Sequence, residues 1–333
     1  LFYNGTEIGY RISTFQVLYT MKVEVEPLDE YYFVGKNVTI RVRCIDNITR
    51  ENITDANVQA TWTKGTVPFT YNSTSRWYEG IFDTSGLKAG KYNVSIQVTK
   101  EYYVKTVKNV TLNLIYPTEV QPKTKIYKIN YTDSINLTIQ YTYSNGTPIR
   151  DANVYTDEFT FSFNGTTYIY EYKPQEIGNF TFIVHCEKPL HQSQNATIKI
   201  EVYVASTEVK CSWTEIEIEY LEETQLNIRY ESNGKGVANA TCTVTYTLVN
   251  GTLRTQIYQT NESGYVALNI SSKIFADNIE KNNVTGQHII NIKLQKYGYE
   301  SQEVNVTVTI IPLSTTLKIR INGENVTFYI VEY

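Results

Sequence analysis

The sequence predicts an all-β protein made of tandem β-sandwich domains. Among its 333 residues are 29 Tyr and many Thr, Val and Ile, whereas Met and His are scarce. β-Branched and aromatic residues favour strands. Apolar and polar residues alternate along many short segments, and no segment keeps the 3.6-residue period of a helix. Because a chain of this length exceeds one ordinary core, we expect several sandwiches and almost no helix.

A recurring hairpin pattern gives the number of sandwiches. Each copy opens with a Gly, continues as an alternating strand, and closes with a second strand that begins at an Asn-x-Thr sequence. The positions that mark the three copies are Gly90 and Asn109, Gly178 and Asn195, and Gly286 and Asn305. Self-similarity of this kind is typical of a tandem array of one supersecondary unit. The sequence therefore predicts three domains, at 21–117, 118–205 and 206–312.

The two ends of the chain do not match a whole copy. Residues 1–20 predict a strand or hairpin extension, and residues 313–333 predict the first strand pair of an incomplete fourth domain. A lone two-stranded hairpin is marginally stable, and both ends carry apolar residues that two strands cannot bury. These residues form the predicted interface: Leu1, Phe2, Tyr3, Ile8, Tyr10, Ile12, Leu317, Ile319, Ile321, Val326, Phe328 and Ile330.

Within each copy the strands are short and are joined by turn-rich loops. Val58, Ala60 and Trp62, for example, share one face of a third strand, and the second strands align through Asn37, Asn136 and Asn227. The alternation predicts these core residues: Val58, Trp62, Val94, Ile96, Phe180, Phe182, Ile290 and Ile292. About seven short strands per ~95 residues is the pattern of a Greek-key immunoglobulin-like sandwich. With its Asp-Ala-Asn-Val elements at Asp55 and Asp151, its Gly-opened hairpins and its sequon-rich strands, the chain resembles the tandem immunoglobulin-like repeats of archaeal and bacterial surface proteins. The resemblance implies an extracellular location.

Asn-x-Ser/Thr sequons are the strongest compositional signal. Such acceptors are used only outside the cytoplasm and on exposed surface. Alternation also places Asn and Thr together on the solvent face of a strand, so an Asn-rich β-protein accounts for part of the excess. Of the 29 Asn residues, 20 begin a sequon and are predicted glycosylation sites: Asn4, Asn37, Asn47, Asn52, Asn72, Asn93, Asn109, Asn130, Asn136, Asn145, Asn164, Asn179, Asn195, Asn239, Asn250, Asn261, Asn269, Asn283, Asn305 and Asn325.

The four cysteines predict one disulfide. Cys211 and Cys242 lie in one copy, and closing the loop between them adds roughly 3–4 kcal/mol in the chain-entropy account. The alternative is a pair of buried free thiols. Cys44 and Cys186 belong to different copies, where we expect a separation far beyond the ~7 Å Cα limit of a bridge. Both are therefore predicted to be reduced core residues.

No resident cofactor and no catalytic site are expected. His185 and Cys186 are strand neighbours that point to opposite faces, and with His191 they lack the ligand number of a dedicated zinc site. No Ser-His-Asp arrangement, phosphate-binding Gly-rich loop or nucleophile elbow occurs in the sequence. The sequence therefore predicts a protein that is not an enzyme.

Two groups of carboxylates stand out. The group from Glu215 to Glu223 alternates along a strand and is read as a solvated face. The other group lies near a turn, where Ca²⁺ with oxygen ligands is an alternative to simple solvation. Its members are Glu24, Glu26, Asp29 and Glu30.

Charge and hydropathy limit the partners. The net charge is -4 with dispersed Lys and Arg, so no basic stripe is available for nucleic acid, and no run reaches the ~20 apolar residues of a membrane span. We expect self-association into a glycosylated extracellular filament or cell-surface layer, joined head to tail by strand sharing between the termini, with neighbouring surface glycoproteins as further partners. The alternative is an adhesin or receptor stalk that is anchored through a region outside this chain.

Overall fold

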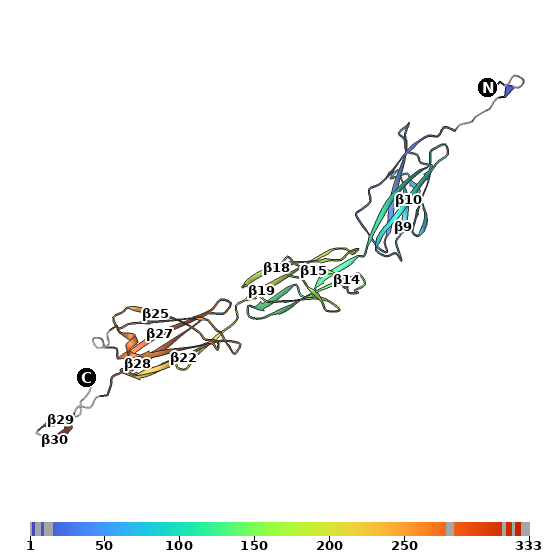
Figure 1. Ribbon diagram of the computed structural model, residues 1–333. Helices are drawn as coiled ribbons and strands as arrows, with labels where there is room; N and C mark the ends of the chain where they lie inside the picture. Colours follow the sequence, from blue (N-terminus) through green and yellow to red (C-terminus); the bar gives the residue numbers. More distant parts are fainter. Residues whose placement is uncertain are drawn as a thin grey trace. The chain divides into compact units, whose positions relative to one another are not determined.

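The protein is almost entirely β-structure. The computed structural model describes residues 16–277 and 283–314, and it describes residues 2–3, 8–9, 318–321 and 324–327 by their backbone alone. In this part of the chain the only helix is the 3-10 segment η1 (Ser272–Phe275), and no helix is long and apolar enough to cross a membrane (Figure 1). These features confirm the predicted all-β class.

The backbone groups into two compact units. The first unit comprises Leu1–Lys125, Asn136–Tyr170 and Phe182–Ile198, and the second comprises Ile126–Ile135, Glu171–Thr181 and Lys199–Tyr333. This grouping does not test the domain boundaries that the repeats predict. The boundaries at 117/118, 205/206 and 312/313 therefore stay a prediction.

The first sandwich consists of two sheets. One has the order β3 (Met21–Val25), β5 (Asn37–Asp46), β9 (Trp77–Asp83) and β8 (Thr70–Asn72); the other has the order β4 (Tyr32–Phe33), β11 (Thr106–Ile115), β10 (Gly90–Thr99), β6 (Asn57–Trp62) and β7 (Gly65–Pro68). Buried and exposed residues alternate along β5 and β10, as period-2 patterning requires. The inward residues of both sheets, such as Ile40, Phe82 and Ile96, form one core.

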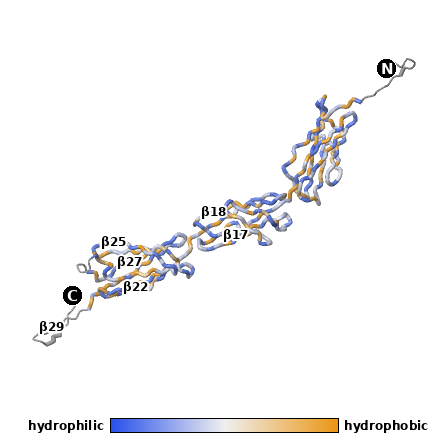
Figure 2. Tube along the Cα trace, in the orientation of Figure 1, coloured by the Kyte–Doolittle hydropathy of each residue, from blue (hydrophilic) through white to orange (hydrophobic). Residues whose placement is uncertain are grey.

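The second sandwich repeats this layout. Its first sheet has the order β12 (Thr118–Pro122), β14 (Ile135–Tyr143), β17 (Tyr168–Tyr172) and β16 (Ser162–Phe163), and its second has the order β13 (Ile126–Asn130), β19 (Gln194–Tyr203), β18 (Gly178–Glu187) and β15 (Asn153–Tyr155). Figure 2 shows hydrophobic and hydrophilic residues succeeding one another along these strands.

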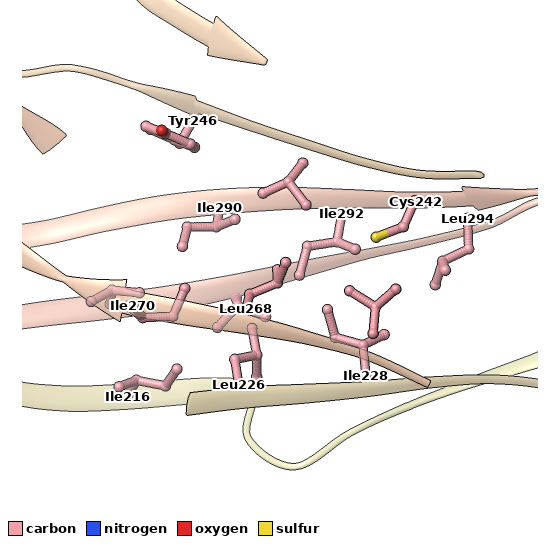
Figure 3. Close-up of a cluster of buried hydrophobic side chains, with 14 of the residues drawn as sticks. Ile216, Leu226, Ile228, Cys242, Tyr246, Leu268, Ile270, Ile290, Ile292 and Leu294 are labelled. Atoms are coloured by element: carbon pink, nitrogen blue, oxygen red, sulfur yellow. The ribbon is translucent and has the colours of Figure 1, made fainter. Parts of the chain in front are cut away.

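The third sandwich has the clearest core. One sheet has the order β20 (Glu208–Cys211), β22 (Glu223–Ser232) and β23 (Lys235–Gly236), with β26 (Tyr265–Ser271) also paired to β22; the other has the order β21 (Glu215–Glu219), β28 (Gln302–Ile311), β27 (Gly286–Gln295), β24 (Thr241–Thr247) and β25 (Leu253–Gln259). Leu226 and Leu268 of one sheet face Ile290 and Ile292 of the other, and all four are buried (Figure 3). The core residues predicted from the alternation are thus confirmed here.

All three sandwiches share one feature of immunoglobulin-like topology. An early strand pairs in parallel with the last strand of the same sandwich: β4 with β11, β13 with β19, and β21 with β28. The strand before it, which is β3, β12 or β20, lies in the opposite sheet. This strand switch and the Greek-key order confirm the predicted tandem immunoglobulin-like sandwiches.

A buried hydroxyl bonds the backbone of the loop that carries the Asp-Ala-Asn element. The Tyr78 hydroxyl donates to the Ile53 carbonyl at 3.0 Å and accepts from the Ala56 N–H at 2.8 Å. Tyr168 makes the equivalent pair of bonds in the second sandwich, and Thr260 makes it in the third. Because a buried backbone group without a partner is costly, the loop that carries the element is fixed by this hydroxyl.

Short hairpins lie at both ends of the described chain. β1 (Phe2–Tyr3) pairs with β2 (Ile8–Gly9), and β29 (Lys318–Ile321) pairs with β30 (Glu324–Thr327). Of the predicted interface residues, Leu1, Tyr10, Ile12, Leu317, Phe328 and Ile330 lie outside the described residues, and Phe2, Tyr3, Ile8, Ile319, Ile321 and Val326 are described by their backbone alone. The interface therefore stays a prediction.

Candidate functional site

In each sandwich, one residue shortly before the first strand is hydrogen-bonded through its backbone to a turn of the same sandwich. We call it the connecting residue. In the first sandwich this residue is Tyr19, two positions before β3. Its N–H donates to the Tyr102 carbonyl at 2.8 Å, and its own carbonyl accepts from the Val104 N–H at 2.8 Å. The two bonds make an isolated parallel bridge between Tyr19 and Tyr103, whose rings lie 5.5 Å apart.

The same bridge recurs in the other two sandwiches. Tyr116 bridges to His191, with bonds of 2.9 Å to the Leu190 carbonyl and 3.0 Å from the Gln192 N–H. Ala205 bridges to Tyr299, and its bonds measure 2.8 and 2.9 Å. The connecting residue is thus held by its backbone, so the type of side chain is free to vary.

The turn that receives the connecting residue has a fixed conformation. Its second-to-last member has a positive φ in each copy: 65° at Tyr102, 63° at Leu190 and 86° at Gly298. This left-handed conformation costs a residue other than Gly roughly 1–2 kcal/mol. In all three sandwiches the carbonyl of this residue accepts the connecting N–H.

A lysine begins each of these turns and ties it to the Asp-Ala-Asn loop. Lys100 forms an ion pair with Asp55. Lys188 Nζ donates to the Arg150 carbonyl at 2.5 Å, and Lys296 Nζ donates to the Ala238 carbonyl at 2.6 Å. The receiving turn is therefore braced by the loop that precedes the third strand of its own sandwich.

These bridges leave almost no free linker between successive sandwiches. β11 ends at Ile115, directly before Tyr116, and β19 ends at Tyr203, two residues before Ala205. In both cases the last strand of one sandwich runs straight into the bridge of the next. By the same pattern, residues 16–18 precede the bridge at Tyr19 as the end of β11 precedes the bridge at Tyr116.

Val17 differs in exposure from its counterpart in β11. The order Gln16-Val17-Leu18-Tyr19 matches Asn113-Leu114-Ile115-Tyr116 residue by residue. Leu114 in β11 is 1% exposed, whereas Val17 is 77% exposed. The apolar side chain of Val17 is thus exposed where its counterpart is buried.

Other apolar side chains extend this surface. We call Val17, Leu18, Tyr19, Tyr102 and Val104 the N-terminal patch, because the bridge joins them and all five are exposed. Contiguous exposed apolar groups are typical of interaction sites.

The loop beside the N-terminal patch is rigid. Tyr103 donates its hydroxyl to Asp46 Oδ2, which lowers the pKa of Asp46 and raises the pKa of Tyr103 to about 12. The other oxygen, Oδ1, accepts the Ile48 N–H at 2.7 Å and the Thr49 N–H at 2.9 Å. The patch therefore belongs to a preorganised end of the sandwich.

The predicted glycosylation sites lie where a glycan can be attached. Asn4 and Asn325 fall outside the residues whose side chains are described, and none of the other acceptor asparagines is buried. Exposure is a requirement for modification, and the modification itself stays a prediction.

All four cysteines are free thiols in the structure. Cys242 is buried in the core of the third sandwich (Figure 3), and Cys211 packs half-buried against the same core from the opposite sheet. Their disulfide stays a prediction, and its formation makes the intact protein two hydrogens lighter. The predicted core positions of Cys44 and Cys186 are confirmed, because both are buried.

Alkylation of the folded protein tests whether the thiols of Cys44 and Cys186 are buried. Burial raises the pKa of Cys44 and of Cys186 to about 12, so at pH 8 only about one thiol in 10,000 is a reactive thiolate. We expect iodoacetamide to leave both residues unmodified until urea is added, as peptide mass spectrometry measures. Rapid labelling in native buffer contradicts their burial.

The groups considered for metal binding have other partners. Glu24 pairs with Lys22 at 2.6 Å and Glu26 with Arg41 at 3.1 Å, which takes two of the four carboxylates considered for Ca²⁺. His185 Nδ1 lies 2.9 Å from Asn195 Oδ1. Among the described residues, no three His, Cys, Asp or Glu side chains gather as metal ligands would.

The sequence reasoning missed the bridges and the N-terminal patch. Tyr19 had no motif around it, and the bridge is made by backbone atoms, which leave no side-chain signature. The one available signal was a recurring lysine. It lies three residues before the turn residue that pairs with the connecting residue, at Lys100, Lys188 and Lys296.

Comparisons with known proteins give structural neighbours only. No protein-family model matches the chain, and no curated protein matches it. A structure from a 1.5-MDa bacterial ice-binding adhesin, concerned with host cell surface retention, is 10% identical, covers 90% of this chain and 100% of its own, and has a TM-score of 0.37.

Two further neighbours are similarly distant. A tetra-tandem repeat from the extending region of a large adhesion protein is 13% identical, with coverages of 88% and 74% and a TM-score of 0.39. Trypsin-activated α-2-macroglobulin from Escherichia coli is 9% identical, with coverages of 88% and 23% and a TM-score of 0.24. Because these TM-scores are below 0.5, the fold assignment depends on the strand order described above.

Proposed function

We propose that this chain is a structural subunit of an extracellular, N-glycosylated filament or surface layer, in which neighbouring chains join head to tail by sharing β-strands. The observation that supports this proposal is Val17, which is 77% exposed in the position where Leu114 is 1% exposed. In the proposed assembly the segment before Tyr19 acts as the closing strand of a sandwich that another chain begins.

The C-terminal hairpin β29–β30 is the complementary part. It supplies two paired strands after the third sandwich, and an added strand would satisfy an open edge by β-augmentation. Such a contact joins unlike surfaces, so it need not close into a ring, and repetition gives a filament. The subunit has no catalytic role in this proposal.

Glycans and location complete the proposal. Sugars on the exposed sequons would cover strand faces and edges, which limits pairing with the wrong chain. The number of acceptor sites supports a location outside the cell, and in this proposal the chain shares its surface with other glycoproteins.

A point variant tests strand sharing without disturbing the sandwiches. Val17→Asp should abolish assembly, because a carboxylate would be buried in the shared core, whereas the melting temperature of the monomer should not change at a position 77% exposed. Sedimentation velocity and negative-stain imaging of the full chain measure the assembly.

The matched control is Ile289→Asp. Ile289 is 61% exposed and lies in β27 of the third sandwich, outside the N-terminal patch, so this variant should assemble like the wild type. Assembly of the Val17 variant, or a wild-type chain that stays monomeric at high concentration, contradicts strand sharing. The second outcome favours the alternative, an adhesin or receptor stalk completed within one longer chain.

A further inference from the structure

A groove with an aromatic wall lies beside one of the predicted glycosylation sites. It has a volume of about 520 Å³, and its lining includes Tyr116, Pro117, Tyr143, Asn145 and Thr147. This volume is within the range of small-molecule sites in proteins. One acceptor asparagine is thus part of the wall of an open, ligand-sized groove.

Three rings hold the aromatic wall in place. Tyr116 and Tyr143 lie 5.7 Å apart, edge to face, and His191 lies 5.2 and 5.4 Å from them. His191 Nδ1 lies 2.7 Å from the Pro189 carbonyl, so that nitrogen carries the proton, and Nε2 accepts the Tyr143 hydroxyl at 2.9 Å. The wall is therefore preorganised, and a ligand that binds there pays little for ordering it.

The turn that carries Asn145 directs its side chain to this wall. The Tyr143 N–H donates to the Thr147 carbonyl at 3.0 Å, and the Gly146 N–H donates to the Tyr143 carbonyl at 2.9 Å. Asn145 Oδ1 accepts the Thr147 N–H at 3.0 Å, which leaves Nδ2 for attachment of a sugar. Tyr143 and Asn145 both line the groove, so that sugar would emerge beside the Tyr143 ring.

A second turn of the same type lacks the tyrosine. Around Asn250, the Leu248 N–H donates to the Thr252 carbonyl at 2.8 Å, and Asn250 Oδ1 accepts the Thr252 N–H at 2.9 Å. The central glycine has a φ of 85°, against 82° at Gly146. Leu248 stands where Tyr143 does and is buried at 4% exposure. The two turns differ in whether an aromatic ring faces the attachment site.

We propose that the groove binds the first sugar of the glycan on Asn145, with the C–H face of a pyranose stacked on the Tyr143 ring. Attachment joins Asn145 Nδ2 to the anomeric carbon of an activated glycosyl donor, while the phosphate leaving group departs and Nδ2 loses a proton. An aromatic ring with a polar edge suits a sugar, whose ring carbons are apolar and whose hydroxyls point outward. The proposal rests on glycosylation and is independent of strand sharing.

A pair of conservative variants tests the stacking in a host whose N-glycans begin with a pyranose. Thr147→Ser keeps the sequon and Thr147→Ala removes it, and each is combined with Tyr143 or Tyr143→Leu. With Tyr143 present, the glycosylated form should melt about 4–8 °C higher than the unglycosylated one. With Leu at position 143 this difference should vanish, and with Tyr143→Phe, which keeps the ring, it should remain.

The turn at Asn250 is the matched control. Thr252→Ser and Thr252→Ala should melt within about 1 °C of each other, because no ring faces that glycan. Equal shifts at both turns, or a shift that survives Tyr143→Leu, overturn the stacking while leaving glycosylation in place. Peptide mass spectrometry that finds Asn145 unmodified in the Thr147→Ser variant overturns both.

Discussion

Replacing Trp62 with Ala is expected to lower the free energy of unfolding of the first sandwich by about 3–5 kcal/mol. Trp62 ends β6, is 8% exposed, and packs edge to face on Phe82 with ring centroids 5.1 Å apart. Phe82 in turn contacts Phe69 at 6.1 Å between centroids. Removing the indole opens a cavity between the two sheets that these rings cannot fill.

Differential scanning calorimetry of the full chain measures this loss. The unfolding transition of the first sandwich should move to lower temperature. The transitions of the other sandwiches should stay in place, because Trp62 belongs to the core of the first sandwich. Trp213→Ala is the control: Trp213 is 59% exposed, so its loss should change stability by less than about 0.5 kcal/mol. An equally stable Trp62 variant would show that this core is not closed around the indole.

Replacing Gly264 with Ala should be comparably severe in the third sandwich, at roughly 3–5 kcal/mol when left-handed strain and overpacking are combined. Gly264 has a φ of 78°, and an added Cβ would lie 2.4 Å from the Tyr230 carbonyl oxygen and 2.7 Å from Gly236 Cα. Both contacts are to backbone. The Gly264 carbonyl also accepts the Tyr230 N–H at 3.0 Å, so the turn cannot move away without losing that bond.

Gly35→Ala distinguishes left-handed strain from overpacking. Gly35 has a φ of 82° with nothing within 4 Å of the added Cβ, so it reports the left-handed strain alone, about 1–2 kcal/mol. Urea titration followed by near-ultraviolet circular dichroism gives both values. Equal losses at the two positions would mean that the close approach at Gly264 relaxes at no cost.

The fold class followed from the sequence because strand alternation is a local property. Val58, Val94 and Ile292 were assigned to cores from period 2 alone, and each is 2% exposed or less. Phe180 was assigned in the same way and is only half-buried, because it lies near the beginning of β18, before the strand enters the core at Phe182.

Strand register was harder to predict than strand face. The sequence aligns the second strands through Asn37, Asn136 and Asn227. The structure aligns them through the residues that pair with the first strand, in the pairs Val23–Cys44, Val120–Tyr141 and Val209–Tyr230. The three asparagines therefore lie seven, five and three residues before the paired position. A shift of two residues keeps a side chain on the same face, so the three asparagines are all exposed although the register differs.

The candidate site was the least predictable part. Bridges made by main-chain atoms impose no side-chain pattern, and the contrast between Val17 and Leu114 depends on which core surrounds each residue. The groove beside Asn145 likewise joins Tyr116 to Tyr143, which are 27 residues apart in the sequence. Pairings of this range are set by the tertiary structure.

The parallel pairing of early and last strands also determines how the chain responds to pulling. When the ends of a sandwich are drawn apart, two parallel strands slide along each other, so their hydrogen bonds are loaded together in shear rather than opened one at a time. β13 and β21 each offer five residue pairs to resist this sliding, whereas β4 offers two, at Tyr32 and Phe33. We therefore expect the first sandwich to give way under tension before the other two.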